Sequence, residues 1–128
     1  MEEFINKRLL IVEDDQVLAS LYEESYNALG VNVDVARDGL EALNKIKQNY
    51  YDLILLDLML PHLDGVSILR KLDEEKVNYG KVVILTNLAN EEFSELMRNQ
   101  LKIEEYLIKA QHSAGEVKNI ISKHLKNS

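Results

Sequence analysis

Short apolar runs recur along the chain, and each one stops at polar or charged residues. The clearest is Leu53–Leu56, which ends at Asp57 and is followed by the turn residues Pro61 and Asp64-Gly65. A short unbroken apolar run bounded by turn residues is typical of a strand buried on both faces inside a parallel sheet. Similar runs predict further strands at residues 8–12 and 81–85, the alternating segment 31–35 predicts a more exposed strand, and residues 105–108 predict a short fifth strand.

The segments between these strands repeat apolar residues at helical spacing. This pattern predicts amphipathic helices over about residues 16–29, 40–48, 66–72, 90–101 and 117–125. Asp15 is expected to start the first helix and Gly30 to be its C-cap, while Phe93, Leu96 and Met97 form the core face of the fourth. Five strands alternating with five helices predict an α/β fold, a parallel sheet covered on both faces. Without repeats or linkers, residues 1–128 are expected to form one domain.

Composition narrows the setting. The 128 residues are 46% hydrophobic, enough for one core, and the absence of cysteine excludes disulfides and thiolate metal sites. The first residues lack the long apolar run of a signal peptide or membrane span, so we expect a cytoplasmic protein without membrane association. A net charge of −7 disfavours a broad nucleic-acid interface, and no direct DNA contact is expected.

The residues that end the predicted strands form a candidate site. Glu13 and Asp14 follow the first strand, Asp57 the third, Thr86 the fourth and Lys109 the fifth. Because the carboxyl ends of parallel strands meet at one edge of the sheet, we expect these groups to converge. Close carboxylates call for a cation, and Mg²⁺ prefers oxygen ligands. Such a site suits a phosphoryl group, with Asp57 as the nucleophile of an acyl phosphate, although a strand-end carboxylate can also merely cap a turn.

Four motifs of the chain resemble the receiver domain of bacterial response regulators. They are LLIVEDD at residues 9–15, LILLDLMLPHLDG at 53–65, VVILTN at 82–87 and YLIKA at 106–110. The resemblance covers essentially the whole chain. It implies a flavodoxin-like, doubly wound parallel sheet of five strands in the order 2-1-3-4-5, with five helices.

The resemblance also implies roles for the residues of the site. Glu13 and Asp14 match the acidic metal pair, and Asp57 matches the phosphoacceptor. The backbone carbonyl of Met59 would be a further ligand of Mg²⁺, with Mn²⁺ as an alternative ion, and Lys109 would bind the phosphoryl group. The domain would then catalyse only its own phosphorylation and slow dephosphorylation.

The resemblance further implies a conformational switch and protein partners. Thr86 would supply the switch hydroxyl and Tyr106 the switch aromatic side chain. The phosphoryl group would come from a histidine kinase or a phosphotransfer protein. The signal would pass to a downstream protein or a second copy through the surface formed by the fourth helix, the fifth strand and the fifth helix.

Two positions depart from the family pattern, and two others are expected to influence the hydrolysis of the acyl phosphate. Ala110 stands where the family usually has proline, so a cis peptide after Lys109 is disfavoured by about 3 kcal/mol. Asn87 occupies a position usually held by a small residue. Met59 and Leu88 are both apolar and should orient a hydrolytic water poorly, which predicts a long-lived phosphoryl group.

Two other functions fit parts of the pattern. A pseudo-receiver would use the same fold as a docking module without phosphorylation, and only Ala110 and Asn87 hint at it. A magnesium-dependent phosphohydrolase would also form an aspartyl phosphate. Such enzymes commonly carry a second aspartate two residues after the nucleophile, where this chain has Met59, and they usually need a cap domain.

Overall fold

The computed structural model describes residues 4–127, apart from the side chains of Glu92, Phe93 and Leu96. Five strands form its sheet: β1 (Arg8–Val12), β2 (Asn32–Ala36), β3 (Leu53–Leu56), β4 (Lys81–Thr86) and β5 (Glu105–Ile108). All neighbouring strands are parallel, and their order is β2-β1-β3-β4-β5. The predicted flavodoxin-like sheet and its strand order are therefore confirmed.

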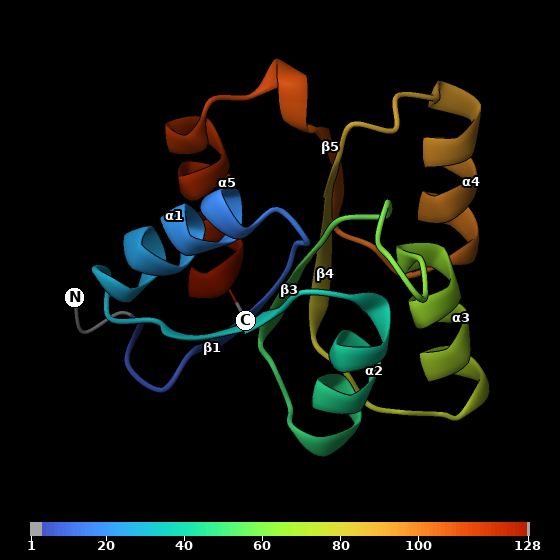
Figure 1. Cartoon of the computed structure of the whole chain (residues 1–128), viewed down its shortest axis with the longest axis horizontal. Coiled ribbons are helices and arrows are strands. Elements are labelled where there is room, and N and C mark those ends of the chain that lie inside the picture. The colour runs from blue at the N-terminus through green and yellow to red at the C-terminus, as the bar shows by residue number, and fades with distance from the viewer. Residues whose placement is uncertain (1–3, 128) are drawn as a thin grey trace.

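Five α-helices cover the two faces of the sheet: α1 (Gln16–Asn27), α2 (Gly39–Gln48), α3 (Gly65–Glu74), α4 (Glu91–Gln100) and α5 (Ala114–Lys126), with a short 3-10 turn η2 (Lys109–Gln111) before α5. Helices α1 and α5 lie on one face, and α2, α3 and α4 lie on the other (Figure 1). Asp15 is the N-cap of α1, as predicted, since its side chain accepts from the N–H of Leu18. The predicted end of α1 is wrong: Ala28 is the C-cap, and Gly30 lies beyond it with a φ of 88°.

Side chains alternate between two cores along each inner strand. In β3, Ile54 and Leu56 pack with α2, α3 and α4, while Leu53 and Leu55 pack with α1 and α5. Because both faces are buried, every residue of the strand is apolar, which explains the unbroken run in the sequence. Met97 of α4 is buried as predicted, whereas Phe93 and Leu96 lie outside the described side chains.

The loop after β3 packs tightly against the start of α3. Asp64 caps this helix by accepting from the N–H of Ser67, and Gly65 donates its N–H to the carbonyl of Leu58. A Cβ added to Gly65 would lie 2.8 Å from the carbonyl oxygen of Asp57 and 2.9 Å from the Cα of Leu58. Only glycine allows this approach, so Gly65 helps to fix the backbone of Asp57.

Replacing Gly65 by alanine should therefore lower the free energy of unfolding by about 1–3 kcal/mol, because the added methyl group overlaps backbone atoms. Gly115→Ala is the matched control, since its Cβ would approach only the Ser113 hydroxyl, at 3.9 Å. This second change should raise stability by about 0.5–1 kcal/mol through helix propensity. Urea denaturation followed by circular dichroism measures both. Equal effects of the two substitutions would contradict the close packing at Gly65.

Candidate functional site

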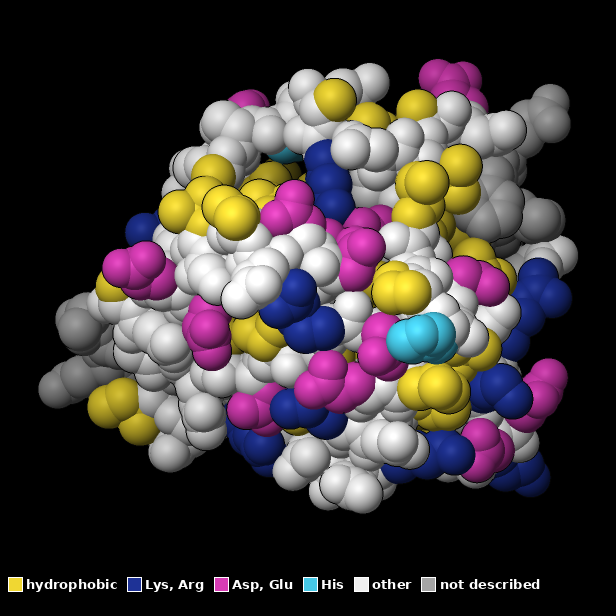
Figure 2. Space-filling view, viewed as in Figure 1, with side chains coloured by type: hydrophobic (Ala, Val, Ile, Leu, Met, Phe, Trp, Pro, Cys, Tyr) yellow, Lys and Arg dark blue, Asp and Glu magenta, His cyan; other side chains and the backbone are white. Residues whose placement is uncertain are grey.

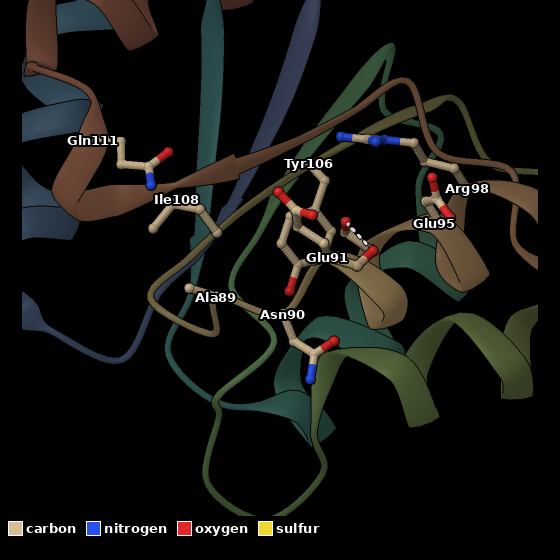
Figure 3. Close-up of a pocket in the computed structure, with 9 residues that line it drawn as sticks. Ala89, Asn90, Glu91, Glu95, Arg98, Tyr106, Ile108 and Gln111 are labelled. Atoms are coloured by element: carbon tan, nitrogen blue, oxygen red, sulfur yellow. Dashed lines mark hydrogen bonds between the residues drawn. The ribbon is translucent and has the colours of Figure 1, made fainter.

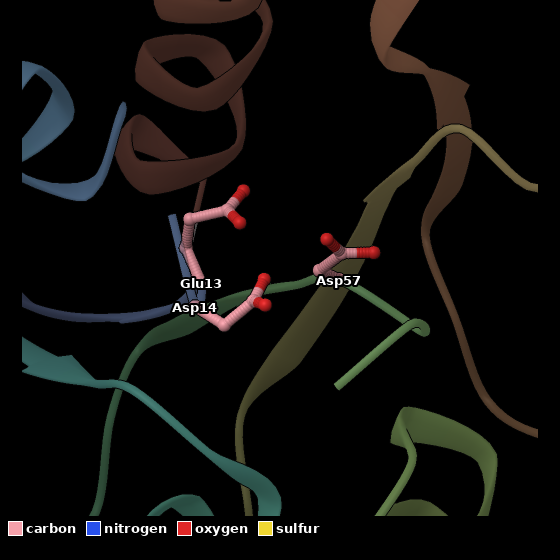
Figure 4. Close-up of side chains that lie close together, drawn as sticks. All are labelled: Glu13, Asp14 and Asp57. Carbon is pink, nitrogen blue, oxygen red and sulfur yellow. The ribbon is translucent and has the colours of Figure 1, made fainter. Parts of the chain in front are cut away.

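Residues from three strand ends meet at the carboxyl edge of the sheet. Glu13 and Asp14 follow β1, Asp57 follows β3, and Lys109 follows β5. One carboxylate oxygen from each of the three acids lies within 4.8 Å of the others, and all three side chains rise from the same edge (Figure 4). Glu13 and Asp57 are only 3% and 6% exposed, whereas Asp14 is exposed to solvent. The predicted convergence is observed for the three acids and Lys109.

Lys109 is the cation that the structure places among these acids. Its Nζ lies 2.5 Å from Glu13 Oε1 and 2.8 Å from Asp57 Oδ2. Burial acts to lower the pKa of Lys109, but its bonds to Asp57 and Glu13 outweigh burial and leave the pKa above the ordinary lysine value. Burial raises the pKa of Glu13, and the bonds from Lys109 and the N–H of Asp15 offset this only in part.

Both carboxylate oxygens of Asp57 have a partner. Oδ2 accepts from Lys109, and Oδ1 accepts from the backbone N–H of Met59 at 3.1 Å. The backbone N–H of Asp57 continues the sheet by donating to the carbonyl of Val12. These contacts hold the Asp57 side chain in one orientation at the end of β3.

The donor set fits a hard divalent cation. Three carboxylates supply oxygen atoms close together, and no sulfur or imidazole ligand is among them. Magnesium takes such ligands and retains several waters, which the exposed position of Asp14 allows. Glu13, Asp14 and Asp57 therefore form a candidate site for Mg²⁺.

One contact at the site was not anticipated from the sequence. Arg37 donates from Nη2 to the backbone carbonyl of Asp14 at 3.0 Å, and its own N–H donates to Glu41. Arg37 directly follows β2, so it ends a strand at the same edge as the acids. The position of Arg37 at a strand end could therefore have marked it as a residue of the site. Its contact with Asp14 could not be predicted, because a backbone carbonyl carries no sequence signature.

Thr86 and Tyr106 belong to a second network, beside the acids. Thr86 is fully buried at the end of β4, and its hydroxyl accepts from the N–H of Leu88 at 3.3 Å. Tyr106 is 7% exposed and donates its hydroxyl to the carbonyl of Leu88 at 2.7 Å. Burial raises the pKa of Tyr106, so its phenol stays protonated and able to donate. The structure thus links both predicted switch residues through the backbone of Leu88.

The Lys109-Ala110 peptide is not cis, since residues 4–127 contain no cis peptide bond. Instead, Lys109 begins the η2 turn, and Ala110 is its second residue. The neighbouring surface carries a groove of about 570 Å³ between α4 and β5 (Figure 3). Its walls include Ser94, Arg98 and Tyr106. Tyr106, which is bonded to the carbonyl of Leu88, therefore also forms part of this surface.

Fold and site together define a parallel α/β domain with an acidic group and a lysine at its carboxyl edge. Residues 9–122 match the protein family described as the response regulator receiver domain. The chain belongs to this family, and the resemblance inferred from its motifs is confirmed. Receiver domains of response regulators interact with histidine kinases and downstream effectors in two-component signalling.

Individual relatives agree with this assignment. The chain is 32% identical over 105 residues to the alkaline phosphatase synthesis transcriptional regulatory protein PhoP of Bacillus subtilis (strain 168), covering 82% of this chain and 43% of that protein. The Francisella response regulator 1452 receiver domain is 32% identical, with a TM-score of 0.84 and coverage of 95% and 98% of the two chains. Response regulator protein TrrA from Thermotoga maritima, in complex with Mg²⁺-BeF, is 27% identical, with a TM-score of 0.74 and coverage of 92% and 98%.

The chain spans less than half the length of the curated relatives it matches. Among residues 4–127, no helix is long and apolar enough to cross a membrane. On the face shown in Figure 2, basic and acidic side chains are interspersed instead of forming a patch of one sign. This face therefore lacks the basic footprint typical of a nucleic-acid interface.

Removal of the Lys109 ammonium should destabilise the metal-free protein. Lys109→Met leaves Glu13 and Asp57 buried without a counter-charge, so the free energy of unfolding should fall by about 1–3 kcal/mol near pH 7. The pKa of Glu13 is already raised above 4.5, and it should rise further in this variant. The native state then takes up protons more readily than the unfolded state, so the loss of stability should shrink as the pH falls from about 7 to about 5.

Chemical denaturation in EDTA, repeated across that pH range, measures this effect. Lys102→Met is the control, because Lys102 is exposed and lies in the loop before β5. It should change stability by about 0.5 kcal/mol or less at every pH. A loss in Lys109→Met that does not depend on pH would argue against charge repulsion as its cause.

Proposed function

We propose that this chain is the phosphoacceptor receiver of a two-component phosphorelay and that Asp57 takes up the phosphoryl group. The observation that carries the proposal is the position of Asp57. It is buried at the end of the central strand, within reach of two further acids, and bonded to the Lys109 ammonium. A carboxylate that merely caps a turn needs neither the acids nor the lysine.

The proposed reaction transfers a phosphoryl group from nitrogen to oxygen. A carboxylate oxygen of Asp57 attacks phosphorus, the P–N bond of the donor breaks, and the leaving nitrogen keeps the electron pair of that bond. With zwitterionic phosphoramidate as donor, neutral ammonia leaves and Asp57 becomes an acyl phosphate. Lys109 then bonds to phosphoryl oxygens, and this placement of charge is the chief catalytic contribution that a protein makes in such transfers.

Glu13, Asp14 and Asp57, together with the backbone carbonyl of Met59, would hold the magnesium ion. The bound ion would offset the charge of the carboxylates and of the incoming phosphoryl oxygens. Lys109 already pairs with Glu13 and Asp57, so it limits repulsion before the donor arrives. Mn²⁺ prefers the same oxygen ligands and is the alternative ion.

In the proposed switch, Thr86 turns its hydroxyl toward the phosphoryl group and Tyr106 responds. Support comes from their shared link to Leu88, because a Thr86 hydroxyl that turns away must release the Leu88 N–H. The α4-β5 groove lies directly beyond Tyr106. We propose the α4-β5-α5 surface as the docking face for a downstream protein or a second copy of the chain.

The remaining assignments extend the same proposal. The donor is a histidine kinase or a phosphotransfer protein, and residues 1–128 act as one receiver domain. The chain modifies itself and turns over no outside substrate. A cytoplasmic location and the absence of direct DNA contact remain predictions from the sequence.

Intact mass after incubation with phosphoramidate and Mg²⁺ tests the acceptor. The native chain should gain one phosphoryl group, because Asp57 is the carboxylate that Lys109 and the acids surround. No gain is expected in Asp57→Asn or in EDTA. Asp52→Asn is a matched control, since Asp52 precedes the same strand at its opposite end and should not affect the gain.

Two other results would redirect the assignment. Without an adduct, even with a beryllofluoride probe observed by NMR, the chain would be a pseudo-receiver that docks unmodified partners. Steady release of phosphate from small phosphomonoesters would instead indicate a phosphohydrolase. Both readouts use the same protein preparation.

The acyl phosphate should be long-lived. Met59 and Leu88 are apolar and 59% and 37% exposed, so neither offers a polar group to orient an attacking water. We expect a half-life of minutes or longer, and Met59→Asn should shorten it several-fold by supplying such a group. Decay of the phosphorylated mass after removal of the donor measures both values. Hydrolysis of the native adduct within seconds would refute this account of the two apolar positions.

A further inference from the structure

Asn87 links the two loops that meet beside the candidate site. Its side-chain Oδ1 accepts a hydrogen bond from the backbone N–H of Ala110, with 3.2 Å between nitrogen and oxygen. Asn87 directly follows β4, and Ala110 lies in the η2 turn that follows β5. The bond therefore joins the ends of two adjacent strands beyond the last pair of their ladder, Thr86 and Ile108.

Lys109 lies between two anchored positions. Before it, Ile108 is held in register with Thr86, and after it, Ala110 is held by Asn87. The backbone that carries Lys109 is thus fixed on both sides by two consecutive residues of the β4 end. Beyond this backbone, a flexible side chain must bring its ammonium to Glu13 and Asp57. A fixed backbone reduces the number of positions that this ammonium can take.

The contact requires both of its members. Ala110 has a backbone N–H to donate, which proline at this position would lack. Asn87 supplies an acceptor from an exposed position, where its side chain has no packing role in either core. The role of the exposed Asn87 amide that the structure shows is therefore this hydrogen bond to the η2 turn.

We propose that Asn87 is a positioning residue for Lys109: its side-chain oxygen holds the Ala110 N–H, and so keeps the η2 turn in the conformation that directs Lys109 to Asp57. The structural part of this proposal stands on the contacts alone. Its effect on phosphoryl transfer rests on the proposed function.

Hydrogen exchange tests the structural part without any phosphoryl donor. In Asn87→Ala, the amide of Ala110 and the ammonium of Lys109 should exchange about three- to tenfold faster by NMR, because one hydrogen bond that restrains them is lost. Asn87→Asp keeps the acceptor oxygen and should exchange at a rate close to that of the native chain. Unchanged exchange at Ala110 and Lys109 in Asn87→Ala would overturn the proposal.

A double-mutant cycle tests whether Asn87 acts through Lys109. The rate constant of acyl phosphate formation at saturating phosphoramidate should fall about three- to tenfold in Asn87→Ala, because the lysine is less well placed. In a Lys109→Ala background, the same change should have no further effect. An equal fall in both backgrounds would mean that Asn87 shapes the entrance to the site instead, and the proposal would be wrong. If the native chain takes up no phosphoryl group, the proposed function fails, while the exchange experiment still decides the role of Asn87.

Discussion

The rest of the site depends on one constraint: two buried carboxylates lie together at the edge of the sheet, and one lysine pairs with both of them. Glu13 follows β1, Asp57 follows β3, and Lys109 follows β5, which among residues 4–127 pairs with β4 alone. The lysine therefore reaches across the end of β4 to hold groups from strands that β5 never touches in the ladder. Buried acids in this arrangement would repel one another without it, so the charge network completes the packing of this edge.

The same arrangement suits the chemistry proposed for Asp57. A carboxylate held by one ammonium and one backbone N–H is already oriented, so little reorganisation is needed when a phosphoryl group arrives. Glu13 is buried with a raised pKa, while Asp14 is open to solvent. The acidic group therefore has one sheltered member and one that incoming ligands can reach. This division suits a site that must exchange ions and donors without losing its structure.

The sequence predicted the fold well because both faces of the sheet are buried, so each inner strand became an unbroken apolar run. The acids and Lys109 could be placed because residues that end parallel strands share one edge. Apart from the helix cap at Asp15, contacts with backbone groups could not be predicted. The partners of Tyr106 and Arg37 are carbonyls, which every residue has, so no residue type signals them. For the same reason, Asn87 and Ala110 stood out separately in the sequence, but their hydrogen bond did not.

The last residue of β4 and the two residues after it contact both Tyr106 and the turn that carries Lys109. The Thr86 hydroxyl binds the N–H of Leu88, the Leu88 carbonyl accepts from Tyr106, and the Asn87 side chain accepts from the turn that carries Lys109. Thr86, Asn87 and Leu88 thus contact Tyr106 and the η2 turn that precedes α5. A Thr86 hydroxyl that turns away releases the N–H of Leu88, the residue whose carbonyl accepts from Tyr106 beside the α4-β5 groove. In the proposed switch, the Thr86 hydroxyl is therefore connected to this surface by two hydrogen bonds at Leu88, which single substitutions can remove.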